Sequence, residues 1–142
     1  MRYLQAAVEH NVRQNMYKYQ KCIATIKGFG TTHYDNAKNV QDSSFSWLCP
    51  LCKHGNHVDL KLVLDGYLFG KEEDLEAELI VLAEEIFSVK LFKSAPCNGW
   101  SYFLKRFCEN CPGIFLLWVG MNEVRNSHYL ISVHGVYEVK KL

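Results

Sequence analysis

Two Cys-x-x-Cys pairs constrain the fold of this chain more than any other feature of its sequence. Cys49 and Cys52 form the first pair, and Cys108 and Cys111 form the second. A tight turn between two cysteines can place both sulfurs on one metal ion, and two such turns complete a tetrahedral site. We therefore expect these four cysteines to hold one zinc ion that stabilises the fold.

The pairs resemble those of zinc-ribbon and zinc-knuckle proteins, through the motifs Cys49-Pro50-Leu51-Cys52 and Cys108-Glu109-Asn110-Cys111. The resemblance is to a class of proteins, and it covers the knuckles and their flanking strands. It implies a structural zinc ion bound by four thiolates. Residues 53–107 separate the pairs, 55 residues in all, whereas simple ribbons space them by about 15 to 20. The intervening segment is therefore predicted to be an insertion.

Residues next to the pairs bear on the metal site. Gly55 and Gly113 follow the pairs closely and would allow the backbone to curl around the ion. His54 and His57 lie beside the first pair and could replace a cysteine as ligand or hydrogen-bond to one. We expect both histidines instead to be exposed near the turn.

Six cysteines could also pair as three disulfides, but only in an oxidising compartment. Residues 1–11 lack the apolar run of a secretory signal, and the apolar stretch 114–119 is far shorter than the roughly 20 residues of a membrane helix. We therefore expect a cytoplasmic protein with reduced thiols and no membrane contact. Cys22 and Cys97, outside the pairs, are expected to be buried as small hydrophobic residues.

A length of 142 residues, 49% of them hydrophobic, predicts a single α+β domain over 1–142. An N-terminal helix is expected at about 2–27, where apolar residues recur at steps of three or four: Leu4, Val8, Val12, Met16, Tyr19, Ile23 and Ile26. The polar composition of about 28–46 predicts a loop. A zinc-pinned core then spans about 47–142.

Within this core, the order strand, cysteine pair, strand occurs twice. Strands are predicted at 57–64, 100–107, 114–121 and 129–139, the last with Gly135 as a candidate bulge. A helix between the pairs begins near Glu72, and its predicted buried stripe is Leu75, Leu79, Leu82, Ala83 and Ile86. We expect both zinc-tipped hairpins to share one antiparallel sheet, with the inserted helix packed across a face.

A zinc ion with four thiolate ligands has no open coordination position, so the metal argues against an enzyme. The chain also lacks a Gly-rich phosphate loop, a nucleophile elbow and a His-Glu-x-x-His helix. The competing enzymatic interpretation is thiol redox chemistry, because the first pair superficially resembles a thioredoxin-like motif. In that motif the first cysteine caps a helix, whereas the residues after Cys52 alternate as a strand.

The charge distribution leaves two binding functions open. Sixteen Lys and Arg nearly balance 15 Asp and Glu, so affinity for nucleic acid would require a local patch. The predicted first helix carries such a patch: Arg2, Arg13, Lys18, Lys21 and Lys27. Residues 72–85 are acidic, and opposite faces of this kind can steer partners, although they could equally face each other within the fold.

We therefore expect a binding module whose partner is another protein. An adaptor or an inhibitor would fit, including an immunity protein that neutralises a toxin. The alternative is a zinc-ribbon-like protein that binds nucleic acid through its basic N-terminal helix, with interleaved aromatic residues stacking on bases.

Overall fold

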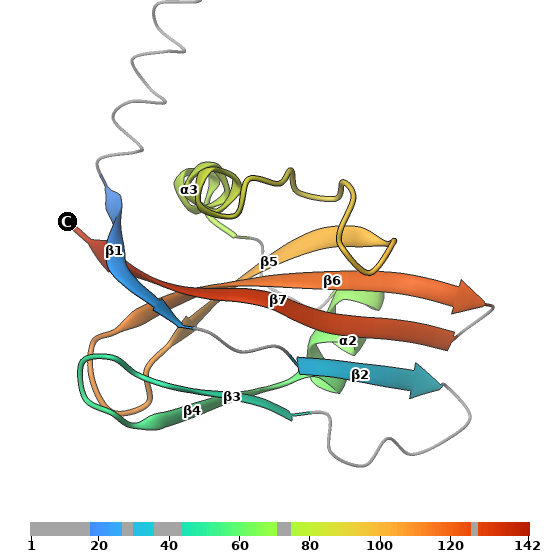
Figure 1. Cartoon of the computed structure of the whole chain (residues 1–142), viewed down its shortest axis with the longest axis horizontal. Helices are drawn as coiled ribbons and strands as arrows, with labels where there is room; N and C mark the ends of the chain where they lie inside the picture. Colours follow the sequence, from blue (N-terminus) through green and yellow to red (C-terminus); the bar gives the residue numbers. More distant parts are fainter. Residues whose placement is uncertain (1–17, 27–29, 36–43, 71–74, 126–127) are drawn as a thin grey trace, which may run out of the picture.

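Figure 1 shows the computed structural model of the chain, which describes residues 18–26, 30–35, 44–70, 75–125 and 128–142. Within these ranges the protein is mostly β-structure, with seven strands and two helices. In chain order the elements are β1 (Tyr19–Ile26), β2 (Gly30–Asp35), β3 (Ser44–Leu48), β4 (Gly55–Asp59), α2 (Leu60–Leu68), α3 (Ala77–Phe87), β5 (Trp100–Phe107), β6 (Ile114–Arg125) and β7 (His128–Lys141).

Five strands form one curled antiparallel sheet organised around β7. β6 pairs with one edge of β7, and β5 extends the sheet beyond β6. The other edge of β7 is shared, because β1 pairs with residues 136–141 and β2 pairs with residues 128–133. Segments far apart in the sequence therefore meet on a single strand (Figure 1).

Different elements cover the two faces of this sheet (Figure 1). α3 packs on one face, where its Leu79 and Leu82 join a cluster with Leu116 of β6. The β3–β4 hairpin forms a separate two-stranded sheet, and it packs on the other face together with α2. Trp47 of β3 meets Phe115 of β6 edge to face, with ring centroids 5.5 Å apart. The hairpin is thus a layer of its own on the larger sheet.

The predictions of an α+β fold and of an N-terminal helix at 2–27 are wrong where the structure tests them. The protein is mostly β, and Tyr19–Ile26 forms strand β1 on the edge of β7. The apolar spacing of this segment fits a helix, but several of its residues are β-branched and favour extended backbone: Ile23, Thr25 and Ile26. Pairing with β7 then decides the conformation. The rest of the predicted helix, 2–17, lies outside the described residues.

The strand predicted at 57–64 is a strand followed by a helix. β4 ends at Asp59, and α2 begins at Leu60. The Asp59 carboxylate accepts hydrogen bonds from the backbone N–H groups of Lys61 at 3.0 Å and Leu62 at 3.3 Å, which makes Asp59 the N-cap of α2. The apolar residues fit both periods, but the buried ones have helical spacing: Leu60, Val63 and Leu64.

The expectation that both hairpins share one sheet is also wrong. The β5–β6 hairpin belongs to the five-stranded sheet, whereas β3 and β4 pair only with each other among the described strands. The loop predicted at 28–46 contains β2 and the start of β3. β2 forms because the N-terminal half of β7 offers an edge for it to pair with.

The remaining elements are confirmed near their predicted bounds. β5 matches 100–107, and β6 and β7 extend the strands predicted at 114–121 and 129–139. The register of β6 against β7 shifts at His134, next to the predicted bulge at Gly135. α3 lies within the predicted helix, and its buried residues belong to the predicted stripe: Leu79, Leu82 and Ala83.

Glu76, the residue before α3, connects this helix to the sheet. Its carboxylate accepts hydrogen bonds from the hydroxyl of Tyr19 at 3.0 Å and from the ammonium group of Lys105 at 2.6 Å. Lys18 lies 3.3 Å from the same carboxylate. The hydrogen bond from Lys105 is the main cause that lowers the pKa of Glu76 to about 2; burial opposes this shift, and Tyr19 and Lys18 add to it.

Glu76→Gln should therefore make the protein less stable and less sensitive to acid. Because the folded pKa of about 2 lies below the usual 4.5, ionised Glu76 contributes its full stability above about pH 4.5 and loses it as the pH falls towards 2. We expect the variant to lose about 1 kcal/mol of unfolding free energy at neutral pH, since the ion pairs are partly exposed. Its stability should also decline less between pH 4.5 and 2. Urea unfolding over a pH series measures both effects.

The control is Glu85→Gln, because Glu85 has an exposed ion pair with Lys21 at 3.5 Å and should contribute little. Superimposable pH profiles for wild type and Glu76→Gln would contradict the role given to Glu76.

Candidate metal centre

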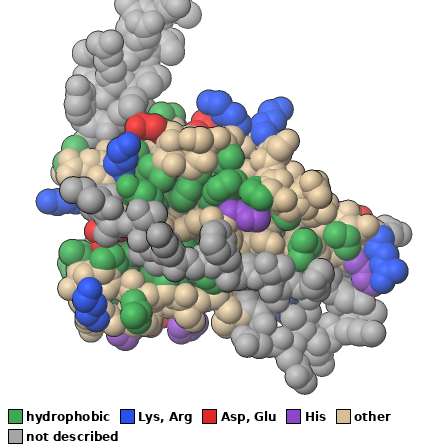
Figure 2. Space-filling model, in the orientation of Figure 1, with side chains coloured by type: hydrophobic (Ala, Val, Ile, Leu, Met, Phe, Trp, Pro, Cys, Tyr) green, Lys and Arg blue, Asp and Glu red, His purple; other side chains and the backbone are tan. Residues whose placement is uncertain are grey.

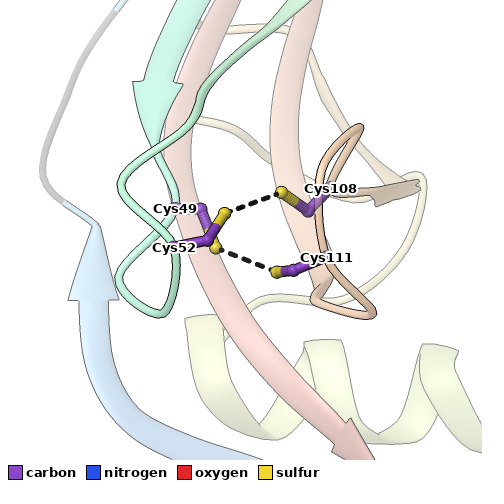
Figure 3. A group of neighbouring side chains, drawn as sticks. All are labelled: Cys49, Cys52, Cys108 and Cys111. Atoms are coloured by element: carbon purple, nitrogen blue, oxygen red, sulfur yellow. Dashed lines mark hydrogen bonds between the residues drawn. The ribbon is translucent and has the colours of Figure 1, made fainter.

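The two cysteine pairs occupy the turns of two hairpins. Cys49 follows β3 and Cys52 precedes β4, while Cys108 follows β5 and Cys111 precedes β6. Figure 3 shows the four side chains pointing towards one another from the two turns. The prediction that these distant pairs converge is confirmed.

The four sulfur atoms form a compact group in which all lie within 4.8 Å of one another. Sγ of Cys49 is 3.6 Å from Sγ of Cys111, and Sγ of Cys52 is 3.6 Å from Sγ of Cys108. A zinc ion bound at about 2.3 Å by four sulfurs has sulfur–sulfur edges of about 3.8 Å in a regular tetrahedron. All four cysteines are free, whereas a disulfide would need a separation of about 2.0 Å. The spacing therefore fits one tetrahedral ion.

Backbone hydrogen bonds close the two turns in the same way. In the first turn, the N–H of Cys49 donates to the carbonyl of His54 at 2.9 Å, and the N–H of Lys53 donates to the carbonyl of Cys49 at 2.8 Å. Lys53 has a φ of 64°, in the left-handed region, which reverses the chain. In the second turn, the N–H of Cys108 donates to the carbonyl of Gly113 at 2.9 Å. Each first cysteine thus bonds across its turn to the residue five positions later.

Gly113 packs directly against the sulfurs. A Cβ atom at this position would lie 3.4 Å from Sγ of Cys111 and 3.6 Å from Sγ of Cys49. A Cβ atom at position 113 would therefore be in van der Waals contact with the cluster. Gly55 differs, because a Cβ atom added there would meet nothing within 4 Å. Of the two glycines predicted to make room for the ion, only Gly113 lies against the cysteine sulfurs.

Asn56 of β4 connects the two turns, and no sequence pattern singled it out. The residue is only 2% exposed. Its Nδ2 donates to Sγ of Cys108 at 3.5 Å and to the carbonyl of His54 at 3.4 Å, and its Oδ1 accepts from the backbone N–H of Glu109 at 3.0 Å. Hydrogen bonds of this kind orient metal ligands and adjust their charge. Asn56 therefore holds the second turn in position against the first.

Hydrogen bonds, burial and neighbouring sulfurs shift the pKa values of the thiols in different directions. Burial opposes ionisation of Cys108, but hydrogen bonds, led by one from the backbone of Asn110, outweigh it and lower the pKa to about 6. A hydrogen bond with the Asn110 side chain is the main cause that lowers the pKa of Cys52. At Cys111, a hydrogen bond with the Gly113 backbone favours the thiolate, yet burial and the neighbouring sulfurs raise the pKa to about 12. A cation is therefore needed for all four thiolates to share this space.

Neither neighbouring histidine joins the cluster, which consists of the four cysteines alone among the residues that the structure describes. Nε2 of His54 lies 3.4 Å from Oε2 of Glu109, a contact that bridges the two turns at the surface. His57 is exposed on β4, as predicted. Cys97 is half-buried in the segment before β5, and Cys22 lies in β1.

The predicted basic patch is only partly described, and its described members face acidic side chains. Nζ of Lys18 lies 2.8 Å from Oε1 of Glu78, and Nζ of Lys21 lies 3.5 Å from Oε1 of Glu85. Both acids belong to α3, so basic and acidic segments meet within the fold. The other members of the patch lie outside the described residues: Arg2, Arg13 and Lys27.

Comparisons with protein-family models, curated proteins and solved structures return no match for this chain. The cysteine cluster is consistent with a zinc-ribbon-like site. Over the described ranges, no helix combines the length and apolar character needed to cross a membrane.

Asn56→Ala should weaken metal binding while leaving the four ligands in place. The change removes the hydrogen bond to Sγ of Cys108 and leaves the N–H of Glu109 without its acceptor. We expect a metal affinity about 10- to 100-fold lower and an unfolding free energy lower by about 1–3 kcal/mol. Competition with a chromophoric chelator measures the affinity.

His54→Ala is the matched control, because it removes an exposed contact beside the same turn and should change both quantities little. Equal effects of the two variants would contradict the role of Asn56.

Proposed function

We propose that this chain is a non-catalytic protein-binding module held together by one structural zinc ion. The observation that carries the proposal is the group of four free cysteine sulfurs within 4.8 Å of one another. The ligands come from two turns, so an ion at this point joins the β3–β4 hairpin to the five-stranded sheet. The free energy of binding such an ion is largely free energy of folding.

The donor set supports zinc as the metal. Four soft thiolates in a tetrahedral arrangement are typical of zinc and iron sites. Closed four-cysteine sites with a structural role commonly hold zinc, which has no redox chemistry of its own. Four cysteine ligands also fill the coordination sphere and leave no position for water or substrate, which favours a structural ion over a catalytic one.

Thiol redox chemistry has less support from the arrangement of the sulfurs. The 3.6 Å contacts join Cys49 to Cys111 and Cys52 to Cys108, so they run between the pairs and not within them. A thioredoxin-like pair stands at the N-terminus of a helix that activates its first thiol. Here the first pair leads into β4 and the second leads into β6.

Exposed apolar side chains flank the cysteine turns and support binding to a protein. Leu48 precedes the first pair and is 63% exposed, Leu51 lies within it and is 68% exposed, and Phe107 precedes the second pair and is 61% exposed. We call these three residues the turn surface. Figure 2 shows hydrophobic side chains at the surface of this end of the molecule. Large apolar side chains on a metal-fixed backbone suit a protein interface, because little order is lost on binding.

Nucleic-acid binding, the alternative from the sequence, relied on the basic patch. Its described members, Lys18 and Lys21, contact acidic residues of α3, which reduces the positive charge they present to a partner. The three side chains of the turn surface are apolar. A protein partner therefore has the better support.

Purified protein should contain one zinc ion per chain by elemental analysis. We expect Cys49→Ser and Cys108→Ser to lose the ion, because each removes one of its four ligands. Both variants should have a much lower Tm, since structural zinc supplies on the order of 10 kcal/mol of apparent binding free energy. Elemental analysis and calorimetry check the two effects.

Cys97→Ser is the matched control, because it removes a thiol outside the cluster and should keep both the metal and the Tm. An unchanged Tm in Cys49→Ser, or purified protein without stoichiometric metal, would contradict the proposal. Stoichiometric iron would overturn the choice of zinc.

The turn surface should carry the affinity for the partner. Leu51→Ser and Phe107→Ser should each weaken binding about tenfold or more, since burying one large apolar side chain stabilises a complex by about 1.5–3 kcal/mol. Both variants should keep their metal. Affinity capture from native extract, identification by mass spectrometry and titration of the purified partner provide the measurement.

Phe69→Ser is the control, because Phe69 is 71% exposed at the end of α2 and lies outside the turn surface. Equal loss in all three variants would contradict a specific role for the turns. Retention of RNA or DNA that weakens steeply with salt would instead favour the alternative function.

A further inference from the structure

The side chains of Cys97 and His134 meet over Gly120 of β6, away from the metal centre. A Cβ atom added to Gly120 would lie less than 3.0 Å from both Sγ of Cys97 and Nε2 of His134, which is closer than Cβ atoms approach other groups in proteins. The absence of a side chain at Gly120 therefore leaves the space in which a thiol and an imidazole come together.

A β-bulge places the imidazole. β7 pairs with β6 at Val133 and again at Gly135, so His134 between them is the extra residue of the bulge. Bulges redirect a side chain and are common next to active sites. The ring of His134 lies 5.1 Å from the ring of Trp118, on which Phe87 of α3 also packs. The imidazole is therefore held among aromatic rings on the face of the sheet that α3 covers.

The segment between α3 and β5 places the thiol, and it passes over the same face of the sheet (Figure 1). Nδ2 of Asn122 in β6 donates to the carbonyl of Cys97 at 3.0 Å. A Cβ atom added to Gly99 would overlap the backbone carbonyl of Met121, so the segment packs directly on β6. The backbone of Cys97 is thus fixed against the strand, while its side chain is only half-buried.

Nε2 of His134 is a polar atom that the described fold does not use. It is buried and has no hydrogen-bond partner among the described residues. Burial also lowers the pKa of His134 below its ordinary 6.5, so the imidazole is neutral at pH 7. A neutral imidazole has one nitrogen that accepts a proton, and a thiol beside such a base is the arrangement of an activated cysteine. Hydrogen bonds within such pairs often form only when the reactant binds.

We propose that Cys97 is a modification site at which a small disulfide forms a mixed disulfide, with His134 as the base. The thiol gives its proton to Nε2, and Sγ attacks one sulfur of the disulfide R–S–S–R. The bond between the two sulfurs of the reagent breaks with its electron pair on the departing sulfur, which takes the proton from Nε2. The products are the mixed disulfide on Cys97 and the free thiol R–SH, so the cysteine is oxidised and the reagent is reduced.

This site goes beyond the proposed binding function and does not depend on the metal. Cys97 precedes β5 and Cys108 follows it, and this strand of eight residues is roughly 25 Å long. The metal-binding cysteines are therefore too distant to displace the new group by forming a disulfide with Cys97. Aromatic rings beside the imidazole favour a reagent with a flat, apolar substituent.

The uncharged aromatic disulfide 4,4′-dithiodipyridine, whose released thiol is coloured, tests the proposal on the metal-loaded full chain. We expect it to modify Cys97 at pH 7 faster than it modifies the metal-bound cysteines, as located by peptide mass mapping. The fast phase should be absent from Cys97→Ser. It should be at least about tenfold slower in His134→Asn, since a positioned base accelerates a reaction by about 100-fold or more. His57→Asn is the matched control, because this histidine is exposed on β4, and it should react as wild type does.

The pH dependence of the rate separates a base from a residue that only shapes the site. In wild type the rate should change little between about pH 7 and 8, because neutral His134 takes the proton throughout this range. The rate should fall at lower pH, once the imidazole is protonated. In His134→Asn it should rise about tenfold per pH unit between these values, since only thiolate formed by loss of a proton to water reacts.

A wild-type rate that rises about tenfold from pH 7 to 8 would overturn the proposal without any substitution. Equal rates for wild type and His134→Asn at pH 7, or a Cys97 that reacts no faster than the metal-bound cysteines, would overturn it as well. The zinc content and Tm of each variant show whether it folds, and the wild-type pH profile decides the question even where His134→Asn does not. None of these outcomes bears on the metal centre or the turn surface.

Discussion

The convergence of four cysteine sulfurs is the constraint on which the rest of the structure depends. A two-stranded hairpin is marginally stable alone, and β3–β4 pairs with no other described strand. The contacts that fix it to the larger sheet include the packing of Trp47 on Phe115 and the turn whose sulfurs meet those of the β5–β6 turn. An ion at that point closes a loop of 55 residues, and this closure fixes the hairpin and α2 over the same face. Asn56 then sets the orientation of one turn against the other.

On the opposite face of the five-stranded sheet, charged side chains connect α3 to the strands. Glu76 gathers Tyr19, Lys18 and Lys105 at the start of α3, which ties the helix to β1 and β5. From the sequence, the basic and acidic segments could form opposite faces that steer a partner. In the described fold they contact each other instead. The surface that we propose for recognition is the apolar turn surface, which flanks the four cysteines.

The metal ligands could be predicted from the sequence because the Cys-x-x-Cys spacing is typical of metal binding. The helix α3 could be predicted because its acidic start and its apolar spacing both indicate a helix. Tyr19–Ile26 and Leu60–Leu64 could not, since apolar spacing in such short segments fits both helix and strand. The edge of β7 decides the first case, and the cap formed by the preceding residue, Asp59, decides the second. Asn56 was missed because a single polar residue makes no periodic pattern. Its only sequence signal is that it shares the inward side of β4 with Val58.

The place of β7 late in the chain bears on how the protein is made. β1, β2 and β6 all pair with β7, yet all three leave the ribosome before it does. The nascent chain therefore carries unpaired strand edges until β7 emerges, the state in which chains associate wrongly with one another. Cys49 and Cys52 likewise emerge long before Cys108 and Cys111, so half of the thiol set is exposed to oxidants and stray metal ions during translation. The β6–β7 hairpin supplies the partner for these edges, and Cys108 and Cys111 complete the thiol set.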